Sequence, residues 1–132
     1  MKTNPIIFSA GLLAAFTAAV HTFAGTYEIH GPLLGSSLPE SVSLLLYACW
    51  HLVTVTLILS AVALIWSARN SRAKSNSALP VFIGLLWLCF GIVFIVVAVF
   101  FSGVDALIVL PQWILLMPIG GLVLLGVRKQ VR

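Results

Sequence analysis

Apolar residues along the chain fall into four long segments that are separated by shorter polar stretches. The segments run from about 5 to 24, 42 to 66, 80 to 101 and 106 to 127. Each is close to the roughly 20 residues that an α-helix needs to cross a bilayer. The shorter alternating segments typical of membrane β-strands are not seen in the sequence. The pattern therefore predicts an all-α integral membrane four-helix bundle, formed by a single domain over residues 1–132.

The three connections differ in composition. Residues 25–37 contain three glycines and a proline and predict an outer loop, whereas residues 67–79 predict a basic, serine-rich inner loop. Residues 102–105 predict a tight outer turn, which makes the third and fourth helices antiparallel neighbours. Within the fourth helix, Pro111 lies early enough to be tolerated, but Pro118 lies near the middle, where a kink is expected.

Two of the three acidic residues have predicted roles at helix ends. Ser37 and Glu40 have the spacing of a capping box at the start of the second helix. Asp105 directly precedes the fourth helix and is expected to be its N-cap. Only Glu28 has no such structural role, which leaves it available for chemistry.

Composition and charge support the membrane assignment and set an orientation. The chain is 61% hydrophobic and only 8% charged, whereas a soluble domain carries roughly 25% charged residues. Its cations all flank apolar segments on one predicted side of the membrane: Lys2, Arg69, Arg72, Lys74, Arg128, Lys129 and Arg132. By the positive-inside rule, both termini are expected to be cytoplasmic, in an inner or plasma membrane. The same placement explains the net charge of +4 without a nucleic-acid partner.

The histidines are the main candidates for chemistry. His21 lies near the end of the first helix and His51 lies in the second, so two antiparallel helices are expected to bring them together near the extracytoplasmic face. If the first helix extends to Tyr27, Glu28 shares the His21 face and His30 hangs above the pair. Imidazole and carboxylate groups bind zinc, and imidazole also binds copper and iron. This predicts a site for a divalent metal, zinc or copper, with His21, His51, Glu28 and His30 as ligands. Expected supporting groups are Tyr47, Thr54 and Asp105.

Two other kinds of site could be formed by the same residues. His21 and His51 could be the axial ligands of a haem, although the outer face offers no Arg or Lys for the propionates. Alternatively, the histidines could accept protons or bind a quinol, because imidazole titrates near neutral pH. A quinol site requires a slot that is accessible from lipid.

A third interpretation assigns these residues no chemistry. The histidines would then hydrogen-bond to Thr22, Thr54 or Tyr47 and hold the helices together. Cys49 and Cys89 are interpreted as small buried hydrophobic residues. Small residues at helical spacing are expected to lie at close helix contacts, namely Ala14, Ala18 and Gly25 in the first helix and Gly84, Gly91 and Ala98 in the third.

The sequence leaves three function classes open, and it leaves open whether the protein is an enzyme. The first is a redox or metal-handling protein built around the histidines. The second is a non-catalytic membrane subunit or assembly protein in a larger complex. The third is a small oligomeric transporter or channel. Stripes of small residues are consistent with a homo-oligomer, since they leave further faces on which helices can pack.

Overall fold

The computed structural model describes residues 3–70 and 77–131. Lys2, Arg72, Lys74 and Arg132, which contribute to the orientation argument, lie outside the described residues. The described part is built from helices and contains no strand. The elements are α1 (Pro5–Gly25), the π-helical turn η1 (Thr26–His30), α2 (Gly31–Leu34), α3 (Glu40–Arg69), α4 (Ala78–Ser102), α5 (Ala106–Val109) and α6 (Trp113–Val131).

Four helical spans among the described residues are long and apolar enough to cross a membrane. They are Pro5–Leu34, Glu40–Arg69, Ala78–Ser102 and Trp113–Gln130. The predicted four-helix architecture is therefore confirmed, and the chain is a multi-pass membrane protein.

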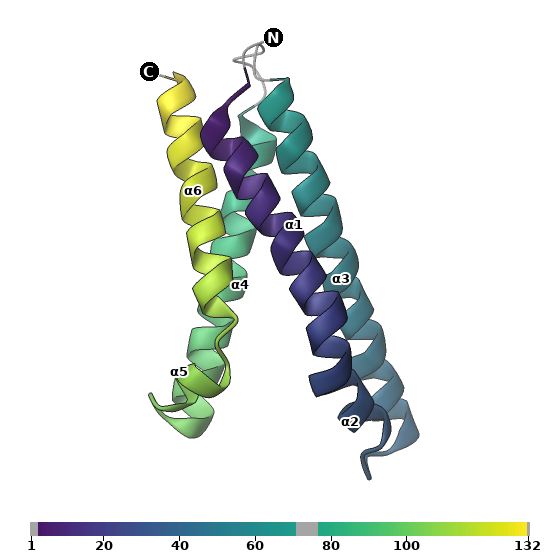
Figure 1. Cartoon of the computed structure of the whole chain (residues 1–132). Helices are drawn as coiled ribbons and strands as arrows, with labels where there is room; N and C mark the ends of the chain where they lie inside the picture. The colour runs from purple at the N-terminus through teal and green to yellow at the C-terminus, as the bar shows by residue number, and fades with distance from the viewer. Residues whose placement is uncertain (1–2, 71–76, 132) are drawn as a thin grey trace.

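The helices form two antiparallel hairpins, α1 with α3 and α4 with α6. Contacts between the hairpins are made mainly by α1 and α6. Figure 1 shows the hairpins meeting at the end that carries both chain termini and diverging toward α2 and α5. We call these the terminal end and the hairpin end.

Small residues explain how closely the helices pack. A Cβ atom on Gly11 would lie 2.8 Å from Cγ1 of Ile65 in α3, and one on Gly126 would lie 2.7 Å from Cγ1 of Ile7 in α1. In the second hairpin, a Cβ atom on Gly84 would lie 3.3 Å from the Gly120 carbonyl oxygen. Lipid is as apolar as the side chains, so close van der Waals contact of this kind, rather than exclusion of water, holds membrane helices together.

Asn4 ties the terminal end together. Its side-chain oxygen accepts hydrogen bonds from the amides of Ile6 and Ile7, which makes it the N-cap of α1. Its side-chain amide donates to the Gly126 carbonyl at 3.0 Å, and its backbone amide donates to the Ala68 carbonyl at 2.9 Å. One residue thus connects α1 to both α3 and α6.

The predicted loop over residues 25–37 is wrong for most of its length. The first helix continues through η1 and α2 to Leu34. Within this continuation, the Gly31 amide bonds to the Thr26 carbonyl five residues earlier, and Pro32 sits in the first turn of α2, where its missing N–H is tolerated. The glycines and the proline of residues 25–37 had suggested that the helix ends there, but it continues through them.

The predicted caps are not formed as expected. Pro39 occupies the N-cap position of α3 and no side chain bonds there, so the capping box of Ser37 and Glu40 is wrong. Asp105 does occupy the N-cap position of α5, but its side chain makes no capping hydrogen bond.

The fourth apolar segment is not one helix from 106 to 127. It breaks between α5 and α6, because Pro111 lacks an N–H and disfavours a helical conformation at Leu110, whose φ and ψ are −115° and 71°. The Trp113 indole nitrogen closes this break by donating to the Leu107 carbonyl at 3.1 Å. Pro118 lies within α6 without ending it.

Both cysteines are free and exposed on the surface of the chain. The interpretation of Cys49 and Cys89 as buried residues is therefore wrong. In a membrane helix an apolar position can face lipid as readily as the core, so an apolar sequence context does not distinguish the two.

Candidate functional site

All three histidines lie toward the hairpin end of the α1–α3 hairpin, but they form two separate arrangements. His21 contacts Trp50 and Thr54, whereas His30 and His51 both contact Tyr47. The sequence had paired His21 with His51 as the leading ligands. The structure also places His51 beside His30, with ring centroids 6.4 Å apart.

His21 has the environment of a structural residue. Its ring stacks on Trp50 with ring centroids 4.0 Å apart, and its Nε2 lies 3.2 Å from Oγ1 of Thr54. The Thr54 hydroxyl donates to the Trp50 carbonyl, so its oxygen accepts from the His21 N–H. This bond across α1 and α3 agrees with the interpretation in which a histidine holds two helices together.

Gly25 makes room for the Trp50 indole. A Cβ atom at Gly25 would lie 2.6 Å from Cζ2 of Trp50, closer than side chains approach one another. The absence of a side chain here lets the indole wedge between α1 and α3 and stack on His21. Gly25, one of the small residues expected at a helix contact, therefore has that role.

The second arrangement consists of His30, Tyr47 and His51, which we call the histidine–tyrosine cluster. The Tyr47 ring stacks on His30 with centroids 4.6 Å apart and meets His51 edge-on at 4.5 Å. The His30 and His51 rings are 6.4 Å apart. The π-helical turn directly precedes α2 and ends at His30, and π turns often occur at functional sites.

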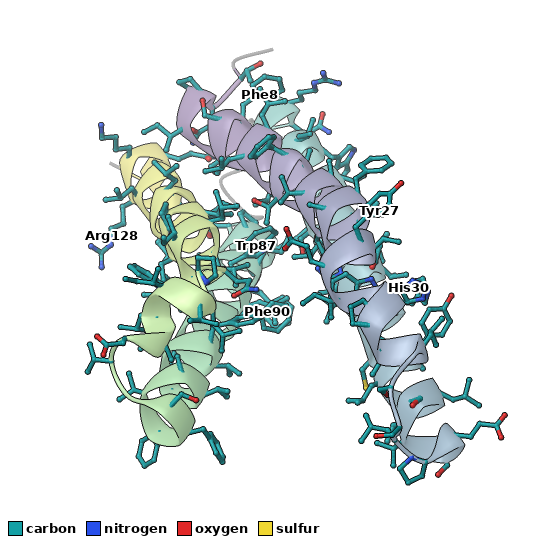
Figure 2. The ribbon with its side chains drawn as sticks, turned by 60° about the horizontal axis from the view of Figure 1, so that its bottom comes forward. Phe8, Tyr27, His30, Trp87, Phe90 and Arg128 are labelled. Carbon is teal, nitrogen blue, oxygen red and sulfur yellow. The ribbon has the colours of Figure 1, made fainter. Side chains whose placement is uncertain are left out.

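The residues of the cluster differ in their exposure and in their hydrogen bonding. His51 is exposed, while His30 and Tyr47 are half-buried. The Nε2 atom of His30 is buried and has no hydrogen-bond partner among the residues that the structure describes. Figure 2 shows His30 on the side of the α1–α3 hairpin that faces away from α4 and α6. Trp87, by contrast, lies on the side of α4 that faces the first hairpin.

The complete ligand set predicted from the sequence is not assembled. Glu28, a predicted ligand, is exposed, and Asp105, expected only as a supporting group, belongs to the other hairpin. Within residues 3–70 and 77–131, no group of three or more histidine, cysteine or acidic residues could hold a metal ion. Any metal at the cluster would therefore have two imidazoles from this chain and would need further ligands from elsewhere.

An apolar groove of about 340 Å³ lies between α1 and α3. Its walls include Ala15, Ala19, Thr22 and Phe23 of α1 and Ile58 and Val62 of α3. Its floor is Ala18 and Ala61, which are almost completely buried at 5% and 4% exposure. Alanine on both helices leaves a hollow because neither side chain extends far from the backbone. Small residues at helical spacing had indicated close helix packing on this face, and no pattern in the sequence predicted the groove.

The groove and the cluster lie on the same face of the hairpin. On α3, residues spaced by four and seven share a face, which aligns Tyr47, His51 and Ile58. His51 is about 10 Å from Ile58 along the helix axis. The groove therefore begins about two helical turns from the cluster and extends toward the terminal end.

The position of the cluster relative to a bilayer follows from helix length. α3 has 30 residues and is about 45 Å long, whereas the hydrocarbon core is about 30 Å thick. If α3 is centred, Tyr47 lies about 3 Å and His51 about 9 Å inside the core boundary. The cluster thus lies just inside the boundary of the hydrocarbon core, and the groove lies deeper.

Comparison with protein-family models, with curated proteins and with solved structures gives no match. The site is therefore interpreted from its own chemistry.

Proposed function

We propose that this chain is a ligand-binding membrane protein whose site is the histidine–tyrosine cluster. The observation that carries the proposal is the gathering of two imidazoles and a phenol on one face of the hairpin, just inside the boundary of the hydrocarbon core. Ionisable and polar side chains within membrane spans are costly and usually serve a function.

The chemistry of the cluster suits a polar ligand. A neutral imidazole offers one donor and one acceptor, and a tyrosine hydroxyl offers both. His51 is the group most accessible to an incoming ligand, because its side chain is exposed.

A second candidate function is metal binding by His30 and His51, in a redox or metal-handling protein. The observation that favours it is the proximity of the two rings, with centroids 6.4 Å apart. Zinc or copper bound there would take its remaining ligands from solvent, from the substrate or from a second copy of the chain.

The haem version with axial ligands from His21 and His51 has less support. One face of the His21 ring is covered by the Trp50 indole, and its Nε2 already bonds to Thr54. Binding an iron there would require both contacts to be replaced.

These proposals can be tested by measuring what the purified protein retains. Gently solubilised protein is analysed for zinc, copper and iron per chain, and its organic extract is analysed by mass spectrometry. The variants are His30→Ala and His51→Ala, and the control is His21→Ala, which removes an imidazole from the same hairpin outside the cluster. We expect a bound species in the wild type and in the control, and a loss of at least tenfold in the two cluster variants.

Two outcomes would contradict the proposal. One is a wild-type protein that retains neither metal nor organic ligand, which would instead support a non-catalytic subunit. The other is equal retention in all three variants, which would place any bound species away from the cluster. A transporter would require histidine-dependent flux of protons or divalent metals in liposomes.

A further inference from the structure

We infer that the ligand of the histidine–tyrosine cluster is an uncharged, ring-headed amphiphile of the membrane quinone type, with its tail in the apolar groove. This inference rests on the proposed function and names its ligand class. It follows from three features of the first hairpin. They are the histidine–tyrosine cluster, the groove that extends from it toward the terminal end, and the lack of lysine and arginine in residues 3–68.

The first feature is the match between the cluster and a flat head group. Tyr47 already stacks on His30 and meets His51 edge-on, so the cluster presents aromatic surfaces together with nitrogen and hydroxyl groups. A quinone or quinol ring carries oxygen atoms that can accept hydrogen bonds from imidazole N–H or phenol O–H groups. The ring itself can pack against the exposed His51 side chain.

The second feature is the length and lining of the groove. Its volume of about 340 Å³ is at the lower end of the roughly 300–1,000 Å³ typical of ligand pockets, and its lining is almost entirely apolar. From His51 to Ile65, at the far end of the lining, the distance along α3 is about 21 Å. A ligand that occupies both regions therefore needs a long apolar tail, whereas a metal ion or a small polar molecule uses only the cluster.

The third feature is electrostatic and selects the head group. Residues 3–68, which include the cluster and almost all of the first hairpin, contain no lysine or arginine, and they include the acids Glu28 and Glu40. An anionic phosphate head group would find no cation among these residues to neutralise it. An uncharged head group needs none.

The test is equilibrium binding of a decyl-tailed benzoquinone to the full chain in phosphatidylcholine nanodiscs, corrected for partition into protein-free nanodiscs. His51→Ala tests the head-group contact. Ala19→Trp and Val62→Trp each fill the groove from a different helix, so that a folding defect in one does not decide the result. The matched control is Ala24→Trp, which places the same indole at an exposed alanine of α1 that does not line the groove.

We expect His51→Ala and both groove-filling variants to raise Kd for the tailed quinone at least tenfold, and Ala24→Trp to change it less than twofold. The same benzoquinone ring without a tail should bind at least tenfold more weakly than the tailed form and should be insensitive to Ala19→Trp. Phosphatidic acid should not displace the tailed quinone.

The outcomes separate the two proposals. Binding that depends on His51 but is unaffected by either groove-filling variant would overturn the amphiphile inference and leave the cluster as a site for a smaller ligand or a metal. Displacement by phosphatidic acid would overturn the choice of an uncharged head. Quinone binding that is insensitive to His51→Ala, together with equal retention of bound species in the cluster variants, would overturn both proposals.

Discussion

The contact between α4 and α6 offers a sharp test of the packing argument, because two adjacent glycines in α6 have opposite surroundings. A Cβ atom on Gly120 would lie 2.6 Å from the Gly84 carbonyl oxygen and 2.6 Å from Cγ of Leu88. A Cβ atom on Gly121 would meet no atom of the described residues within 4 Å. The same glycine-to-alanine substitution, made one residue apart, should therefore have different effects.

The magnitude follows from two terms. Both alanines gain helix propensity, worth roughly 0.8–1.0 kcal/mol in a helix interior, and this gain cancels when the two variants are compared. Only Gly120→Ala carries an overpacking cost, typically about 1–3 kcal/mol. Leu88 can turn aside, but the Gly84 carbonyl is backbone, so α4 and α6 must separate to admit the methyl group. We expect Gly120→Ala to be less stable than Gly121→Ala by about 1–3 kcal/mol.

The assay is reversible unfolding in mixed micelles by increasing the fraction of SDS, followed by far-UV circular dichroism. The free energies of unfolding of the two variants and the wild type are compared under identical conditions. Equal stability of the two variants, or a greater loss in Gly121→Ala, would refute the close approach of α4 and α6 at Gly84 and Gly120.

Three further predictions concern other parts of the molecule. Thr54→Val should lower the free energy of unfolding by about 0.5–1.5 kcal/mol through loss of the bond to His21, whereas Thr56→Val, whose hydroxyl bonds within its own helix, should have a smaller effect in the same assay. Asn4→Ala should cost about 0.5–2 kcal/mol for the lost α1 cap alone, so a neutral result would contradict the role assigned to this residue. A fluorescent-protein fusion at the C-terminus should be bright and an alkaline-phosphatase fusion there inactive, and the reverse pattern would refute the cytoplasmic placement of the termini.

The candidate site shows where sequence reasoning succeeded in part. The common face of Tyr47 and His51 follows from helical spacing, and the structure confirms that their rings meet. The identity of the residue that joins Tyr47 and His51 could not be predicted from this spacing, because it depends on how far the first helix continues. The glycines and the proline of residues 25–37 predicted a loop, whereas the π-helical turn carries the helix on and brings His30 against Tyr47.

The groove could not be read from the sequence for a related reason. Alanines on a membrane helix are equally consistent with a close contact and with a surface that faces lipid. Ala18 forms the floor of the groove while Ala19, the next residue, lines its open side. Only the relative rotation of α1 and α3 separates these two roles.

The sequence by itself determined the class of this protein, because the length and number of apolar segments are fixed by the thickness of a bilayer. It also determined many of the close helix contacts, since only small residues permit them. The tertiary structure decided which histidines meet, where the fourth segment breaks and which face carries a groove. In a membrane span nearly every face is apolar, so hydrophobic periodicity does not indicate which side of a helix meets protein. That choice depends on steric contacts between residues distant in sequence, such as Gly25 with Trp50 and Gly84 with Gly120.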